Sequence, residues 1–214
     1  MKVISLGNSC KVRESIDRFN SVKEETNIFD WVISDFSAVV YIFNAFENGK
    51  EDELFHEDKF INNGICPNNT IHCALVHTDM QFHSIHDVHS NISYDLQKHE
   101  FIEKYRRRCR RLRETIQNYP HNIHFIYFIS FKETIPTINE IYFFIMSIKK
   151  LRGELPFVIH ILVPPEFYCY QDTINSCMIT NNVNVIYMTS DPSIDPFKEQ
   201  RRDLNWSEIY NSFY

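Results

Sequence analysis

The stretch MKVISLGNSC, residues 1–10, decides the predicted fold class. Residues 1–6 are mostly apolar and indicate a short buried strand, which ends at the turn residues Gly7 and Asn8. A helical pattern begins at Cys10, so a thiol stands at the corner between a strand and a helix. The free N–H groups of a first helical turn favour a thiolate over a thiol. Cys10 is therefore a candidate nucleophile, although a free cysteine is most often a small core residue.

The rest of the chain alternates between apolar runs of strand length and amphipathic helical patterns. We expect strands at residues 123–130, 157–163 and 183–188, and helices at 11–19, 36–46, 101–117, 138–151 and 205–213. This alternation predicts one α/β domain with a mostly parallel central sheet flanked by helices. Sites in such sheets gather at the carboxyl ends of the strands, and Cys10 follows the first of these ends.

Composition and charge exclude several classes of function. The net charge of -6 argues against a protein that mainly wraps a nucleic-acid backbone. Four glycines form no phosphate-binding loop, so we expect no nucleotide and no other cofactor. Six cysteines without a C-x-x-C pair predict reduced thiols rather than a disulfide scaffold or a zinc knuckle. No apolar run approaches the roughly 20 residues of a membrane span, so we expect a cytoplasmic protein with no membrane or nucleic-acid partner; its oligomeric state is open.

Residues 51–93 have a weak pattern, contain six of the ten histidines, and are expected to be irregular and functional. The segment HSIHDVH, residues 83–89, offers a base for the thiolate, because a Cys–His pair activates the nucleophile. Spacing alone does not choose among His83, His86 and His89. The same three histidines would bind a metal only if they converged, and no cluster of cysteines or carboxylates adjoins them, so we expect no metal site.

A basic run, RRRCRRLR at residues 106–113, lies on a predicted amphipathic helix. In an acidic protein such a run is more simply a solvated face with intrahelical ion pairs than a nucleic-acid surface. One or two of these arginines are candidates to turn inward toward a buried carboxylate, for which Asp30 is the best candidate.

Several short segments of this chain occur in an order that resembles one known family. The segments are SLGNSC at 5–10, IFDW at 28–31, HD at 86–87, YRRRCRRL at 105–112, and Trp206. Together they resemble the putative papain-like cysteine peptidases, a domain of unknown function found in bacteria and large DNA viruses. The resemblance spans nearly the whole chain, so residues 1–214 are expected to form a single α/β domain of this type.

The resemblance implies a nucleophile at Cys10 and a general base at His86. It also implies an acidic partner, which we place at Asp203, with Asp87 and Asp30 as the alternatives. The residues expected to bind substrate lie within the same motifs: Asn8, Asp30, Trp31 and Arg107.

We therefore expect a thiol hydrolase or acyltransferase, a peptidase or an esterase, that acts on a protein or small acyl substrate. His86 would deprotonate Cys10, the thiolate would attack a carbonyl carbon, and backbone N–H groups would stabilise the oxyanion. A papain-like core places its nucleophile beside an antiparallel sheet, whereas the alternation here is closer to small esterases with a serine at this corner. The alternative is a non-catalytic protein-interaction module with a structural cysteine, which predicts an inert thiol.

Overall fold

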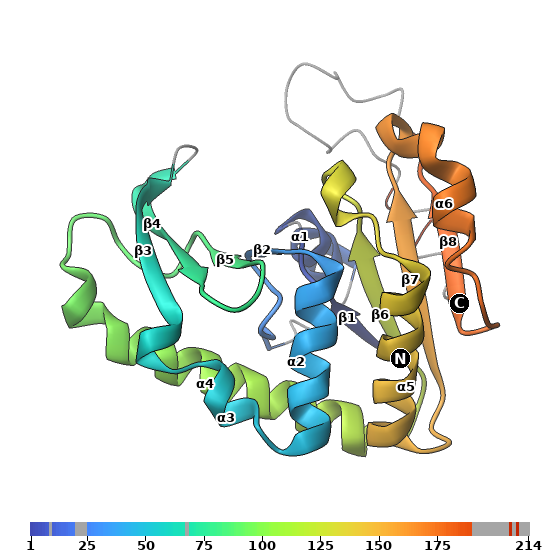
Figure 1. The fold of residues 1–214 in the computed structure, drawn as a ribbon, viewed down its shortest axis with the longest axis horizontal. Helices are drawn as coiled ribbons and strands as arrows, with labels where there is room; N and C mark the ends of the chain where they lie inside the picture. The colour runs from blue at the N-terminus through green and yellow to red at the C-terminus, as the bar shows by residue number, and fades with distance from the viewer. Residues whose placement is uncertain (9, 20–24, 67–68, 190–205, 207–208, 210–214) are drawn as a thin grey trace.

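The computed structural model describes residues 1–8, 10–19, 25–66, 69–189, 206 and 209. Within them two four-stranded sheets lie beside each other, one parallel and one antiparallel (Figure 1). The elements are β1 (Lys2–Ser5), α1 (Cys10–Phe19), β2 (Val32–Ser34), α2 (Phe36–Asn48), α3 (Glu51–Leu54), η1 (Glu57–Lys59), β3 (Phe60–Cys66), β4 (Asn69–His77), β5 (Phe82–Ser84), α4 (Tyr94–Asn118), β6 (Ile123–Phe128), η2 (Lys132–Thr134), α5 (Ile138–Arg152), β7 (Phe157–Val163), η3 (Pro165–Tyr170), α6 (Gln171–Asn175) and β8 (Val183–Tyr187).

The parallel sheet has the strand order β1-β6-β7-β8, and its central strands β6 and β7 are buried on both faces. Side chains alternate along each strand, so one face of β6 carries Tyr127 and packs toward α2 and α5 (Figure 1). The other face carries Phe128 and packs on α1, Trp206 and Ile209. The predicted parallel sheet with flanking helices is confirmed, and the predicted strand at 157–163 has the bounds of β7.

The antiparallel sheet has the strand order β2-β5-β4-β3 and was not predicted. Our expectation of an irregular region at residues 51–93 is therefore wrong for most of its length. The core face of β4 includes the buried His77. This polar residue interrupts the alternation of apolar and polar residues by which a half-buried strand is recognised in a sequence. On β3 the register shifts between Asn62 and Ile65, around a Gly64 with φ of 84°. From the sequence alone, a bulge of this kind is easily mistaken for a turn.

The predicted helices at 101–117 and 205–213 have different outcomes. The helix expected at 101–117 is longer and forms α4, which begins at Tyr94. The helix expected at 205–213 lies outside the described residues except for Trp206 and Ile209, which are helical and buried. Trp206 stacks on Phe128, with ring centroids 5.8 Å apart. No helix in the described part of the chain has the length and apolar character that a membrane crossing requires.

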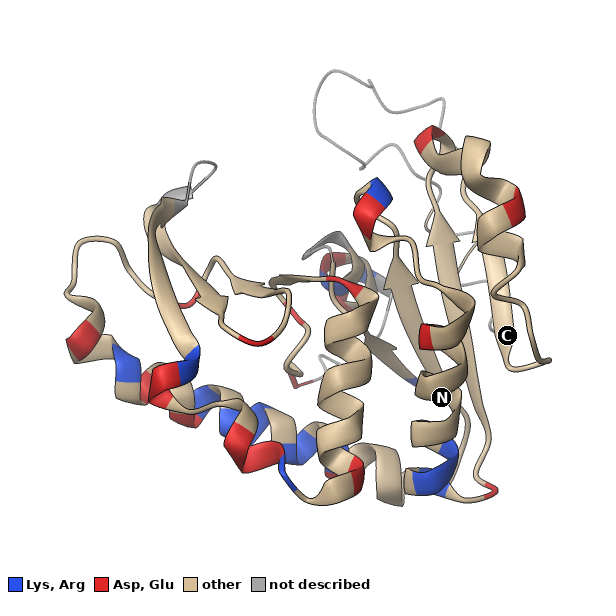
Figure 2. Cartoon of the chain, in the orientation of Figure 1, with Lys and Arg blue, Asp and Glu red and all other residues tan. Residues whose placement is uncertain are grey.

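Basic residues of α4 lie alongside the acidic segment of α3 and η1 (Figure 2), and ion pairs join the two. Arg113 pairs with Glu51, Arg110 lies 3.8 Å from Asp52, and Lys98 lies 3.5 Å from Glu57. We expected the arginines of the run at 106–113 to form ion pairs within the helix. Arg106 does so, with Glu103 at 2.9 Å. The basic run thus joins α4 to the segment that leads into the antiparallel sheet.

Candidate functional site

The corner between β1 and α1 has the strand-turn-helix form that residues 1–10 predict. The turn passes through Gly7 and Asn8, with φ values of 86° and 67°, and α1 begins at Cys10. Asn8 is buried, and its side-chain Nδ2 donates to the carbonyl of Phe128 over 3.0 Å. The hydroxyl of Ser130 donates to the Asn8 carbonyl over 2.6 Å. Contacts from the end of β6 therefore hold the corner, while the side chain of Cys10 lies outside the described structure.

The second motif, IFDW, forms a tight turn before β2. Asp30 is fully buried and accepts from the backbone N–H of Asn27 over 2.7 Å and from Arg13 Nη1 over 3.2 Å. Burial raises the pKa of Asp30 from 3.8 to about 6, although the charge of Arg13 opposes this rise. Trp31 follows with a φ of 66°. Among the described residues, Asn8 and Trp31 are the non-glycine positions with positive φ, a strained geometry that clusters at functional sites.

His86 lies half-buried in the loop after β5 and packs against the turn of Trp31. The two rings meet edge to face, with centroids 5.8 Å apart. Burial lowers the pKa of His86 below 6.5, and the neighbouring His72 lowers it further. The charges of Asp87 and of Glu14, in the second turn of α1, oppose this effect. The lowered pKa favours the neutral imidazole, the form that accepts a proton.

The carboxylate of Asp87 points at α4 and is bound by side chains there. It accepts from the hydroxyl of Tyr105 over 2.5 Å and from that of Ser84 over 2.9 Å, and it pairs with Lys104. Burial alone would raise the pKa of Asp87, but the hydrogen bonds from Lys104 and Tyr105 outweigh it and the pKa is lowered. Asp87 thus fastens the loop that carries His86 to the long helix.

The rival histidines lie in different places. His83 is half-buried on β5, where it pairs with Ile33 of β2 and Val76 of β4. His89 is exposed, and its ring lies 4.8 Å from that of His72. Among the described residues, no three histidine, cysteine, aspartate or glutamate side chains form a group that would hold a metal ion.

His72 belongs to the site but gave no signal in the sequence. Its ring lies 6.0 Å from that of His86, and its Nδ1 is buried with no hydrogen-bond partner within the described chain. It stands on β4, in the region whose strands escaped prediction. Its place beside His86 follows from the pairing of the antiparallel strands, which sequence spacing did not reveal.

The arginines are arranged differently from what the sequence led us to expect. Arg107 is exposed on α4, and the buried arginine is its neighbour Arg108, whose Nη1 lies 3.7 Å from Asp87. The carboxylate of Asp30 is bound instead by Arg13 of α1. Arg13 also pairs with Asp17 one turn away. In the sequence, this i,i+4 spacing indicates an ion pair within the helix but gives no sign of the contact with Asp30. Asp203, the expected acidic partner, lies outside the described residues.

The comparisons with known proteins identify one family. Residues 1–165 match the model of a family described as putative papain-like cysteine peptidase, a domain of unknown function. No curated protein and no solved structure matches the chain.

Proposed function

The chain belongs to the family of putative papain-like cysteine peptidases, and from this membership we propose that it is a thiol hydrolase or acyltransferase with Cys10 as nucleophile and His86 as general base. One observation carries the proposal. The loop of His86 packs on the turn of Trp31 and lies close enough to α1 for the charge of Glu14 to act on the imidazole. Glu14 stands one helical turn after position 10.

The start of α1 supports the role of Cys10. Two motifs that are far apart in the sequence, the turn of Trp31 and the loop of His86, are in contact, and Glu14 in the second turn of α1 is near enough to raise the pKa of the imidazole. The N–H groups of a first helical turn and the positive end of the helix dipole lower the pKa of a thiol at this position. The neutral imidazole of His86 is the acceptor that such a thiol requires.

In the proposed reaction His86 takes the proton of the Cys10 thiol and the thiolate adds to a carbonyl carbon. The N–H groups at the start of α1 stabilise the resulting oxyanion. Collapse of this intermediate breaks the bond to the leaving group, which receives the proton from His86, and leaves an acyl group on Cys10. Water or another nucleophile, deprotonated by His86, then releases the acyl group and restores the thiol.

We propose Asp203 as the acidic partner of His86. The two alternatives, Asp87 and Asp30, both have their carboxylates engaged by other groups: Asp87 by Tyr105 and Lys104, Asp30 by Arg13 and the backbone.

We keep four residues as the substrate-binding set of a cytoplasmic enzyme that acts on a protein or small acyl substrate: Asn8, Asp30, Trp31 and Arg107. Trp31 and Arg107 have accessible surface and are the proposed direct contacts. Asn8 and Asp30 are buried, so we propose that they shape the two turns beside the substrate.

The proposal is tested by the pH dependence of alkylation, measured by mass spectrometry at each cysteine of the native protein. Cys10 is expected to react well below the ordinary thiol pKa of about 8.5. The exposed Cys169 is the internal reference, and burial raises the pKa of Cys109 and Cys177. In the His86→Ala variant the advantage of Cys10 should disappear.

A matched control for that variant is His83→Ala, since His83 is also half-buried and its pKa is also lowered by burial. This variant should leave the reactivity of Cys10 unchanged. A Cys10 that reacts no faster than Cys169 at neutral pH, or equally fast without His86, would remove the catalytic role.

The alternative, a non-catalytic interaction module, is favoured by one observation. Apolar side chains are exposed along the antiparallel sheet, the loop that follows it and the first turn of α4: Ile61, Ile65, Ile71, Ile92 and Leu96. This alternative predicts that the thiol of Cys10 is inert while substitutions on this surface abolish binding of a partner protein.

A further inference from the structure

Arg108 is a buried cation at the centre of α4, and its fractional exposure is 6 %. Its Nη1 lies 3.7 Å from Oδ2 of Asp87, the residue that follows His86. The guanidinium carbon lies 5.1 Å from the centre of the Tyr105 ring, so a cation–π contact fixes the head group. Tyr105 donates to the same carboxylate oxygen of Asp87 over 2.5 Å. Arg108 therefore belongs to the group that holds the loop of His86.

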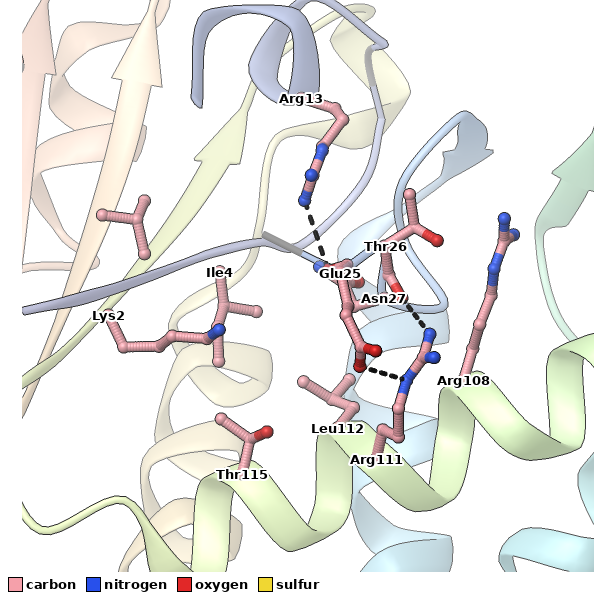
Figure 3. Close-up of a pocket in the computed structure, with 11 residues that line it drawn as sticks. Lys2, Ile4, Arg13, Glu25, Thr26, Asn27, Arg108, Arg111, Leu112 and Thr115 are labelled. Carbon is pink, nitrogen blue, oxygen red and sulfur yellow. Dashed lines mark hydrogen bonds and ion pairs between the residues drawn. The ribbon is translucent and has the colours of Figure 1, made fainter. Parts of the chain in front are cut away.

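Arg108 also faces the turn that carries Trp31. It lines a cavity of about 100 Å³ together with Arg13 and Asn27 (Figure 3). Those two residues are the ones that bind Asp30, the residue before Trp31. The charge of Arg108 also lowers the pKa of Asp30. One guanidinium thus acts on two buried carboxylates, one in each segment of the candidate site.

We infer that Arg108 is a positioning residue that holds the turn of Trp31 and the loop of His86 together, so that the indole packs on the imidazole. The inference rests on the proposed function only in treating His86 as the general base. Trp31 and His86 are adjacent to the two anchored carboxylates, Asp30 and Asp87 respectively. A shift of either carboxylate therefore moves a ring of the contact.

Physical chemistry explains why arginine suits this place. Asp30 and Asp87 each have another cation, Arg13 and Lys104, so the loss of Arg108 weakens the charge compensation of both buried carboxylates without abolishing it. The planar guanidinium has donors on several sides and can act on two carboxylates at once, whereas the ammonium of lysine is a compact point charge. The neighbouring Arg107 is exposed, which provides a matched control on the same helix.

The test uses the fluorescence of Trp31 in the full-length protein. The chain has two tryptophans, and Trp206→Phe leaves Trp31 as the only one while keeping a ring against Phe128. A protonated imidazole in contact with an indole quenches its emission, so a pH titration reports the contact with His86. The His86→Gln variant assigns the transition, because the transition should be lost in it.

In this background Arg108→Met is expected to lose more than half of the quenching amplitude, while Arg107→Met keeps it. Arg108→Lys retains the charge and serves if Arg108→Met does not fold. It should also lose part of the amplitude, since an ammonium lacks the planar guanidinium that packs on the Tyr105 ring and faces Asp87. A full amplitude in either variant of Arg108 would overturn the inference. Reactivity of Cys10 is measured in parallel: if the amplitude falls and the alkylation rate does not, the positioning role stands and the base role of His86 fails.

Discussion

The indole of Trp31 meets the imidazole of His86 edge to face, with ring centroids 5.8 Å apart and ring planes inclined by 77°. Trp31 reaches this position through a left-handed backbone, with a φ of 66°. A bulky residue takes this conformation only where its surroundings impose it, at a cost of roughly 1–3 kcal/mol. The buried Asp30, held by Arg13 and Asn27, is the restraint directly before it. The strained backbone of Trp31 therefore places its indole against the imidazole of His86.

Removing that cover should raise the pKa of His86. Burial is the largest cause of its lowered pKa, so Trp31→Ala is expected to bring the value back toward 6.5. The titration of the His86 Hε1 resonance by NMR measures this change. Trp31→Phe is the control, since a phenyl ring keeps most of the cover and the pKa should stay low. An unchanged pKa in Trp31→Ala would mean that other groups desolvate the imidazole.

Two neighbours of His86 should shift its pKa in opposite directions. His72 lowers the pKa of His86, so His72→Phe, which keeps a ring in place, is expected to raise it. The charge of Glu14 raises the pKa of His86, so Glu14→Gln is expected to lower it. The same NMR titration measures both, and each variant is the control for the other. Shifts of the same sign in the two variants would contradict this placement of Glu14 and His72.

The parallel half of the fold was predictable because its central strands are buried on both faces. β6 and β7 are continuous apolar runs, and such runs need no knowledge of their neighbours to be recognised. The antiparallel half was not predictable in this way. Its strands mix polar residues into the core face, as His77 does, and its bulge at Gly64 resembles a turn. There tertiary packing, rather than the local pattern, decides the structure.

The same division holds for the candidate site. Motifs in the sequence pointed to the corner before Cys10, to Trp31 and to His86. They did not point to Arg13 or to His72, whose roles depend on contacts between elements far apart in the chain. One or two inward arginines of α4 were expected without a choice of position. That the buried one is Arg108, and that it lies near Asp87, depends on the rotation of the helix against the sheet.

Asp30 should make the protein less stable as the pH rises. Its pKa is 3.8 in the reference state and about 6 in the folded protein, so folding favours the protonated form. The stability that this group contributes is complete below pH 3.8 and is lost as the pH rises through 6. A shift of this size corresponds to about 3 kcal/mol.

The measurement compares urea unfolding of the native chain and of Asp30→Asn between pH 4 and pH 7. The free energy of unfolding of the native chain should fall relative to that of the variant by about 2 kcal/mol over this range, since part of the effect is already lost at pH 4. Asp87, whose lowered pKa acts with the opposite sign, is present in both proteins and cancels in the difference. Parallel curves for the two proteins would show that Asp30 is ionised without cost.

Gly7→Ala should distort the corner from which α1 starts. A Cβ at Gly7 would lie 2.2 Å from the hydroxyl oxygen of Ser34, and the φ of 86° already disfavours any side chain. We expect a loss of about 2–4 kcal/mol, the sum of the backbone cost and the clash, measured by urea unfolding. Gly49→Ala is the matched control, because its φ is also positive but nothing lies within 4 Å of its Cβ. It should lose about 1 kcal/mol.

The clash is separable from the backbone cost by a second substitution. Ser34→Ala removes the hydroxyl oxygen and leaves its Cβ 3.5 Å from the new methyl group, an ordinary contact. Ser34→Ala alone is the reference, because it removes the hydrogen bond from this buried hydroxyl to the Leu6 carbonyl. Relative to that reference, the loss in the double variant Gly7→Ala/Ser34→Ala should fall to that of Gly49→Ala. If it stays as large as the loss in Gly7→Ala, the backbone rather than Ser34 requires glycine. Reactivity of Cys10 in the same three proteins then tells whether the thiol depends on the shape of the corner, since a displaced α1 no longer points its first N–H groups at the thiolate.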